Sequence, residues 1–77
     1  MEEKNIRLKL ARVEKDLSQE QLAQKVGVSR QTINMIEKGK YNPSLSLCLE
    51  ICWALERKLD DLFWKEYEEE EESNEGI

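Results

Sequence analysis

Residues 17–41 read LSQEQLAQKVGVSRQTINMIEKGKY, and the fold follows from this stretch. Ser18, with Gln21 three residues later, forms a capping box that begins a helix, and Gly27 ends that helix. After one bridging residue, Ser29 can act as the N-cap of a second helix. The spacing therefore predicts two short helices joined by a tight turn.

The second helix is expected to continue to Glu37 or Lys38, before Gly39 supplies a left-handed C-cap. The small side chain of Ala23 indicates that the two helices cross at this position. The apolar side chains on both helices have the spacing needed to lock the pair at a steep angle. They are Leu22, Ala23, Val26, Val28, Ile33 and Ile36.

The outward face of the second helix is polar, which packing alone does not require. A helix pair of this kind presents the first turn of its second helix outward, where short polar side chains can enter a major groove of DNA. The pattern therefore favours DNA binding over a purely structural helix pair. The positions outside the core are Arg30, Gln31, Asn34 and Met35.

Three further helical segments flank the pair, so the sequence predicts an all-α domain of five helices. The first spans roughly residues 7–15. Ser44 caps the fourth helix, and the fifth begins near Leu59 with acids in its first turn that complement the helix dipole. The fourth helix is expected to bury one apolar stripe, formed by Leu45, Cys48, Cys52 and Leu55.

Size and composition exclude several classes of protein. The 77 residues fit one domain with a small core, and the chain has no histidine for general-base catalysis or metal binding. We therefore expect no enzyme, no cofactor and no metal site.

No apolar run approaches the ~20 residues of a membrane span and no signal peptide begins the chain, so a cytoplasmic protein is expected. Cys48 and Cys52 are expected to be reduced, buried thiols.

Charge is segregated along the chain. The formal net charge is −5, yet residues 66–77 contain seven acids and no base, whereas residues 1–65 contain twelve bases and ten acids. Residues 4–40 alone carry nine bases against four acids, which suits a surface that faces phosphates. We expect one domain over residues 1–67 and an acidic, disordered tail over residues 68–77.

The segments LSQEQLAQKVGVSRQTI, IEKGKYNPSL and LDDLF resemble the Cro/CI-type (XRE family) helix-turn-helix regulators over about residues 8–63. Within that family the chain is most similar to the short single-domain homodimeric repressors. The resemblance implies a five-helix, lambda-repressor-like fold, with a short terminal β-ribbon before the first helix and after the fifth. It also implies an operator with two-fold symmetry, no catalysis and no domain for a small-molecule ligand.

The resemblance assigns base reading to the second helix of the pair. Arg30 suits guanine through O6 and N7, and Gln31 suits adenine through N6 and N7. Met35 departs from the polar residue often found at its position, which leaves open whether it meets a thymine methyl group or a sugar. The full set is Ser29, Arg30, Gln31, Thr32, Asn34 and Met35.

The resemblance also assigns contacts with the DNA backbone. Gln19 would hydrogen-bond a phosphate and help to orient the recognition helix, assisted by the free amides at the start of its own helix. The loop after the recognition helix would set the register of binding without reading sequence. Its contributing residues are Lys38, Lys40, Tyr41 and Asn42.

Arg12 and Glu37 match a pair that in phage repressors forms a largely buried ion pair between the first and third helices. Arg12 shares a helix face with Leu8 and Ala11, which favours the ion pair over two solvated charges. The contribution of such a pair to net stability is open, because desolvation offsets attraction. Removal of one partner alone would leave the charge of the other buried and unpaired.

The first helix has a second apolar stripe, pointing away from the face of Leu8. It consists of Ile6, Leu10, Val13 and Leu17. A domain this small cannot bury both faces of one helix by itself.

We expect part of this extra surface to pack across a dimer axis, together with aromatic residues at the C-terminal end. The alternative is a wider monomer core that leaves Trp53 and Trp64 singly exposed. The expected dimer interface comprises Leu10, Phe63, Trp64 and Tyr67.

The function expected is a sequence-specific transcriptional repressor that binds an inverted-repeat DNA operator as a homodimer. Two alternatives use the same domain. One is an antitoxin or protein-interaction module whose acidic tail occupies a partner, and the other is a DNA-mimicking or anti-repressor role for residues 68–72. An adjacent toxin gene would favour the antitoxin, whereas an adjacent regulated operon would favour the repressor.

Overall fold

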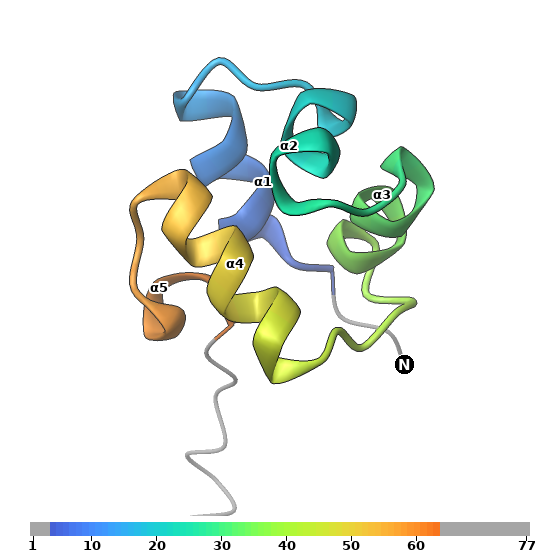
Figure 1. Cartoon of the computed structure of the whole chain (residues 1–77). Helices are drawn as coiled ribbons and strands as arrows, with labels where there is room; N and C mark the ends of the chain where they lie inside the picture. Colours follow the sequence, from blue (N-terminus) through green and yellow to red (C-terminus); the bar gives the residue numbers. More distant parts are fainter. Residues whose placement is uncertain (1–3, 64–77) are drawn as a thin grey trace, which may run out of the picture.

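The computed structural model describes residues 4–63, which form five helices and no strand (Figure 1). This confirms the predicted all-α architecture. The expected tail over residues 68–77, and most of the expected terminal ribbon, lie outside the described residues. The helices are α1 (Ile6–Glu14), α2 (Gln19–Val26), α3 (Arg30–Glu37), α4 (Leu45–Leu55) and α5 (Leu59–Phe63).

Serine N-caps begin three of these helices, as the sequence predicts. The hydroxyls of Ser18, Ser29 and Ser44 each accept a hydrogen bond from the backbone amide three residues ahead, at 3.0, 3.1 and 3.1 Å. At α2 the capping box is complete, because Gln21 Oε1 accepts the Ser18 N–H at 2.8 Å. Gly27 ends α2 in the left-handed conformation, at a φ of 79°. A Cβ added there would meet nothing within 4 Å, so the position needs glycine for its backbone conformation and not for space.

α1 begins at Ile6, one residue earlier than predicted, because Asn5 caps it. Asn5 Oδ1 accepts the Leu8 amide at 3.0 Å, and the helix ends at Glu14. The backbone N–H of Asn5 also donates to the carbonyl of Glu37 at 2.8 Å, which ties the start of α1 to the end of α3. The apolar Leu8 at the third helical position leaves no capping box, so this cap has no clear signal in the sequence.

α4 buries a face that differs in part from the predicted stripe. Cys48, Cys52 and Leu55 are buried as expected, but Leu45 is 63% exposed and Ile51 is fully buried. Ile51 lies three residues after Cys48 and four before Leu55, which places all three on one side of the helix. The prediction was wrong at Leu45 because the spacing alone cannot tell where the neighbouring helices end.

The core lies where the five helices meet. α2 and α3 pack closely on each other, α4 packs on α2, and α5 packs on both α1 and α4 (Figure 1). The side chains with essentially no exposed surface are Leu8, Leu22, Ile33, Ile51 and Leu55. These residues come from four helices, and α3 itself packs mainly on α2 and to a smaller extent on α1.

Cys48 and Cys52 are free thiols within this core. Burial raises the pKa of both, and the pKa of Cys52 is raised further by the neighbouring Cys48 and Asp61. Both side chains are therefore protonated at neutral pH and act as small apolar packing groups.

The C-terminal ends of α1 and α4 meet through ion pairs at the surface. Lys15 Nζ lies 2.6 Å from Glu56 Oε1, and Arg57 pairs with Glu14. The hydrogen bond from Lys15, and then its charge, lower the pKa of Glu56. Pairs this exposed fix the geometry of the helix ends more than they stabilise the fold.

Candidate nucleic-acid interface

The predicted base-reading residues lie on the solvent side of α3 and at its N-cap. The opposite side of the helix carries Ile33 and Ile36, which are buried in the core. α3 is thus held by its apolar side and offers a polar first turn to solvent, which is the arrangement of a helix that enters a groove. Ser29, Arg30 and Gln31 are exposed, and Thr32, Asn34 and Met35 are half-buried.

Two of these residues are already hydrogen-bonded to each other. The Ser29 hydroxyl accepts the Thr32 backbone N–H at 3.1 Å and shares a hydrogen bond with the Thr32 hydroxyl at 3.0 Å. Capping the helix therefore uses hydrogen-bonding capacity of both hydroxyls. Arg30 and Gln31 are exposed in the same turn and carry groups that can bond a base through two atoms, so they are the stronger candidates for reading sequence.

The predicted phosphate-contacting residues fall at two places around α3. One place is the loop after the helix, and the other is the start of α2, where Gln19 is half-buried. Contacts from these residues would position α3 on a duplex without reading sequence. The loop residues Lys38, Lys40, Tyr41 and Asn42 are all exposed.

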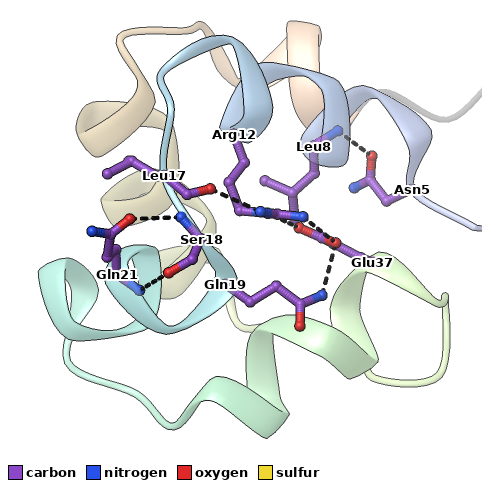
Figure 2. A network of polar contacts seen from close by, with 8 residues as sticks. All are labelled: Asn5, Leu8, Arg12, Leu17, Ser18, Gln19, Gln21 and Glu37. Carbon is purple, nitrogen blue, oxygen red and sulfur yellow. Dashed lines mark hydrogen bonds and ion pairs between the residues drawn. The ribbon is translucent and has the colours of Figure 1, made fainter.

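Arg12 and Glu37 form a buried ion pair that joins α1 to the end of α3 (Figure 2). Arg12 Nε lies 2.7 Å from Glu37 Oε2, and Arg12 Nη2 lies 3.3 Å from Glu37 Oε1. The third nitrogen of the guanidinium, Nη1, donates to the carbonyl of Leu17 at 2.8 Å. Both residues are less than a tenth exposed, so each charge depends on the other for compensation.

Gln19 completes this network, since its Nε2 donates to Glu37 Oε1 at 3.0 Å (Figure 2). Residues from α1, from the turn after it, from α2 and from α3 thus meet around one carboxylate. Glu37 is the only acid in α3, and its charge is neutralised inside the domain. The solvent face of α3 therefore carries no acid that would repel a phosphate.

Two of the four residues of the expected dimer interface, Leu10 and Phe63, lie in the described part of the chain. Leu10 is 56% exposed on α1, beside the exposed Ile6 and Val13. Phe63 is half-buried and packs on the core. Trp64 and Tyr67 lie outside the described residues.

A second apolar face lies on α4 and was missed in the sequence. Leu45, Leu49 and Trp53 are 63%, 51% and 79% exposed. Their spacing of four residues puts them along one side of the helix, and that spacing was the available signal. The domain therefore has two exposed apolar helix faces, one on α1 and one on α4.

Two short helices crossing at a tight turn, the second with a polar, outward first turn, define a helix-turn-helix DNA-binding domain. The chain belongs to the helix-turn-helix family HTH_3, which matches residues 8–62, and so to the XRE-type regulators that the sequence resembles. It is a DNA-binding transcriptional regulator, and members of this class are not enzymes. No helix within residues 4–63 is long and apolar enough to cross a membrane.

Individual relatives agree with this assignment. The chain is 57% identical over 51 residues to the uncharacterized HTH-type transcriptional regulator YgzD of Bacillus subtilis, covering 66% of this chain and 77% of YgzD. It is 45% identical over 49 residues to the immunity repressor protein of Bacillus phage phi105, covering 64% of this chain but 34% of the repressor. The crystal structure of the restriction-modification controller protein C.AhdI from Aeromonas hydrophila superposes with a TM-score of 0.72 at 37% identity, covering 77% of this chain and 89% of C.AhdI.

Proposed function

We propose that this regulator is a repressor, and that two copies bind an inverted-repeat operator. The observation that carries the proposal is the exposed pair Arg30 and Gln31 in the first turn of a short recognition helix. One such helix reaches too few base pairs to specify an operator. Two copies related by a two-fold axis would place their helices about 34 Å apart, one turn of B-DNA. The names of the phage immunity repressor and of the controller protein support a regulatory role of this kind.

The α1 face supports the homodimer. Ile6, Leu10 and Val13 are each more than half exposed on a helix whose other side is buried in the core. α5 packs on α1 and ends at Phe63, another residue of the expected interface. Burial of three adjacent apolar side chains against a second copy would favour association.

Base reading is tested by selecting bound duplexes from a random pool and then measuring variants on the selected site. Arg30→Ala and Gln31→Ala should each weaken binding by about 1–3 kcal/mol and relax the preference at one base pair per half-site. Lys38→Ala should weaken selected and random duplexes alike, because phosphate contacts carry no sequence information. Equal losses on all sequences for Arg30→Ala and Gln31→Ala would refute base reading.

Dimerisation is tested by sedimentation with two matched variants. Leu10→Glu places a charge on the α1 face, and Trp53→Glu places one on the α4 face, which is similarly exposed. If the dimer forms through α1, Leu10→Glu should be a monomer with much reduced operator affinity, while Trp53→Glu should remain a dimer. The opposite result would move the interface to α4. A monomeric unaltered protein bound singly to an asymmetric site would overturn the dimer and the inverted repeat together.

A further inference from the structure

Gln19 differs from the other predicted phosphate-contacting residues because a buried group holds its side chain. Its Nε2 donates to Glu37 Oε1 at 3.0 Å, and Glu37 is 7% exposed (Figure 2). The loop residue Lys38, by contrast, has an exposed side chain. The orientation of the Gln19 amide is therefore determined within the domain before any DNA is bound.

The chemistry of Glu37 decides which end of that amide faces it. A carboxylate only accepts hydrogen bonds, so the nitrogen of Gln19 must point toward Glu37 and the amide oxygen must point away. The carboxylate itself cannot turn freely, because Arg12 donates to both of its oxygens, at 2.7 and 3.3 Å. Arg12 is in turn held by its bond to the carbonyl of Leu17 at 2.8 Å. The amide of Gln19 is thus the last member of a chain of fixed partners.

A DNA phosphate also only accepts hydrogen bonds, so a contact from Gln19 has to use an N–H. The amide nitrogen carries two N–H groups, of which Glu37 takes one and leaves the other for a phosphate. Without a carboxylate at position 37, the amide could turn over and present its oxygen, which a phosphate repels. Holding the amide in advance also removes the loss of side-chain freedom that would otherwise accompany binding.

We propose that Glu37 is a positioning residue for DNA binding, which acts by orienting the Gln19 amide toward the phosphate backbone. The inference rests on the proposed phosphate contact of Gln19. It assigns the buried ion pair a role in affinity beyond its role in joining α1 to α3.

The test is a double-mutant cycle measured on a random-sequence duplex, which needs no knowledge of the operator. Gln19→Ala should lower affinity roughly tenfold, as expected for loss of one hydrogen bond to a charged group. Glu37→Gln should cause a similar loss, since a neutral amide no longer selects one orientation of Gln19. Adding Gln19→Ala to Glu37→Gln should then cost little more. The slope of affinity against salt should stay unchanged in all three, because no cation is removed.

Ile51→Val is the matched control for a general loss of stability. It weakens the core at a residue with no exposed surface and leaves the network of Glu37 intact. In this background Gln19→Ala should keep its full tenfold effect. If Gln19→Ala costs as much with Glu37→Gln as without it, Glu37 does not position Gln19.

A measurement on the unaltered protein covers the case in which Glu37→Gln does not fold. By NMR, one side-chain amide proton of Gln19 should be shifted from the position of the corresponding proton in the exposed Gln24 and Gln31, because it is bonded to a carboxylate. On addition of the duplex, one Gln19 proton should move while the other keeps its shift. Equal movement of both would overturn the positioning role. Failure of the unaltered protein to bind any duplex would instead overturn the proposed function, so the two failures can be told apart.

Discussion

The buried ion pair of Glu37 and Arg12 connects α1 to α3 in this small domain. Each is buried, and each supplies the charge that compensates the other. Buried pairs of this kind add little to net stability compared with an apolar pair of the same volume, but they cannot be broken from one side without leaving a buried charge. Their value here lies in fixing which helices meet at the carboxylate.

Arg12→Met should therefore destabilise the domain by about 3–5 kcal/mol, because it leaves the Glu37 carboxylate buried without a compensating charge. The double variant Arg12→Met with Glu37→Leu should recover most of that loss. Urea unfolding at neutral pH measures both. Lys15→Met removes a half-buried surface cation from the same helix end and should have a much smaller effect. A double variant as unstable as Arg12→Met alone would show that the bond to Leu17, and not the ion pair, carries the effect.

The two thiols give a prediction about pH. Burial raises the pKa of Cys48 and Cys52 in the folded state, so their contribution to stability is complete below the pKa of an unfolded cysteine, about 8.5. As the pH rises through that value and then through the folded pKa, the unfolded state loses protons first and stability falls. Unfolding free energy measured from pH 7 to 10 should decline more in the unaltered protein than in a Cys48→Ala, Cys52→Ala variant. Parallel declines would mean that the thiols titrate as they do in water.

At the scale of single elements, the turn between α1 and α2 stores a backbone strain. Asp16 has a φ of 59°, in the left-handed region that favours glycine. Asp16→Gly should therefore be more stable than Asp16→Ala by about 1 kcal/mol, since alanine keeps the strain and glycine relieves it. Thermal unfolding of the two variants measures the difference. The same comparison at the exposed Glu20, inside α2, serves as control and should favour alanine.

The elements could be predicted wherever their signals are local. Ser18 with Gln21, and Gly27 after them, mark α2 within a few residues, and all three act in the structure as the sequence indicates. The buried side of α4 is different in kind, because Leu45 and Ile51 are equally apolar and only the neighbouring helices decide which is covered. Local chemistry therefore predicted where α2 begins and ends, but not which face of α4 would be buried.

The candidate site also has one part that local sequence predicts and another that depends on the tertiary structure. The polar face of α3 follows from its periodicity, so Arg30 and Gln31 could be placed on the solvent side from sequence alone. The hydrogen bond from Gln19 to Glu37 joins residues 18 positions apart in two different helices. No spacing rule connects them, because their meeting depends on the angle at which α2 and α3 cross.

At the scale of the whole molecule, the segregated charge predicts an effect of the acidic tail on binding. Deleting residues 68–77 removes six acids and changes the formal net charge from −5 to +1. Affinity for random duplexes should rise at low salt, and rise more than affinity for the operator, because non-specific binding is mostly electrostatic. The difference should shrink as salt screens the charges. A variant with residues 68–72 changed to glutamine separates charge from chain length. Unchanged low-salt binding in both would leave the tail without a role in DNA binding.

All five helices share one apolar core, and the carboxylate of Glu37 adds a polar connection among three of them. Glu37 lies at the end of α3 and accepts hydrogen bonds from Arg12 of α1 and Gln19 of α2. Association of apolar groups weakens on cooling, while polar bonds do not share that weakness. As the protein is cooled, the hydrogen bonds at Glu37 should therefore contribute a growing share of the cohesion among α1, α2 and α3.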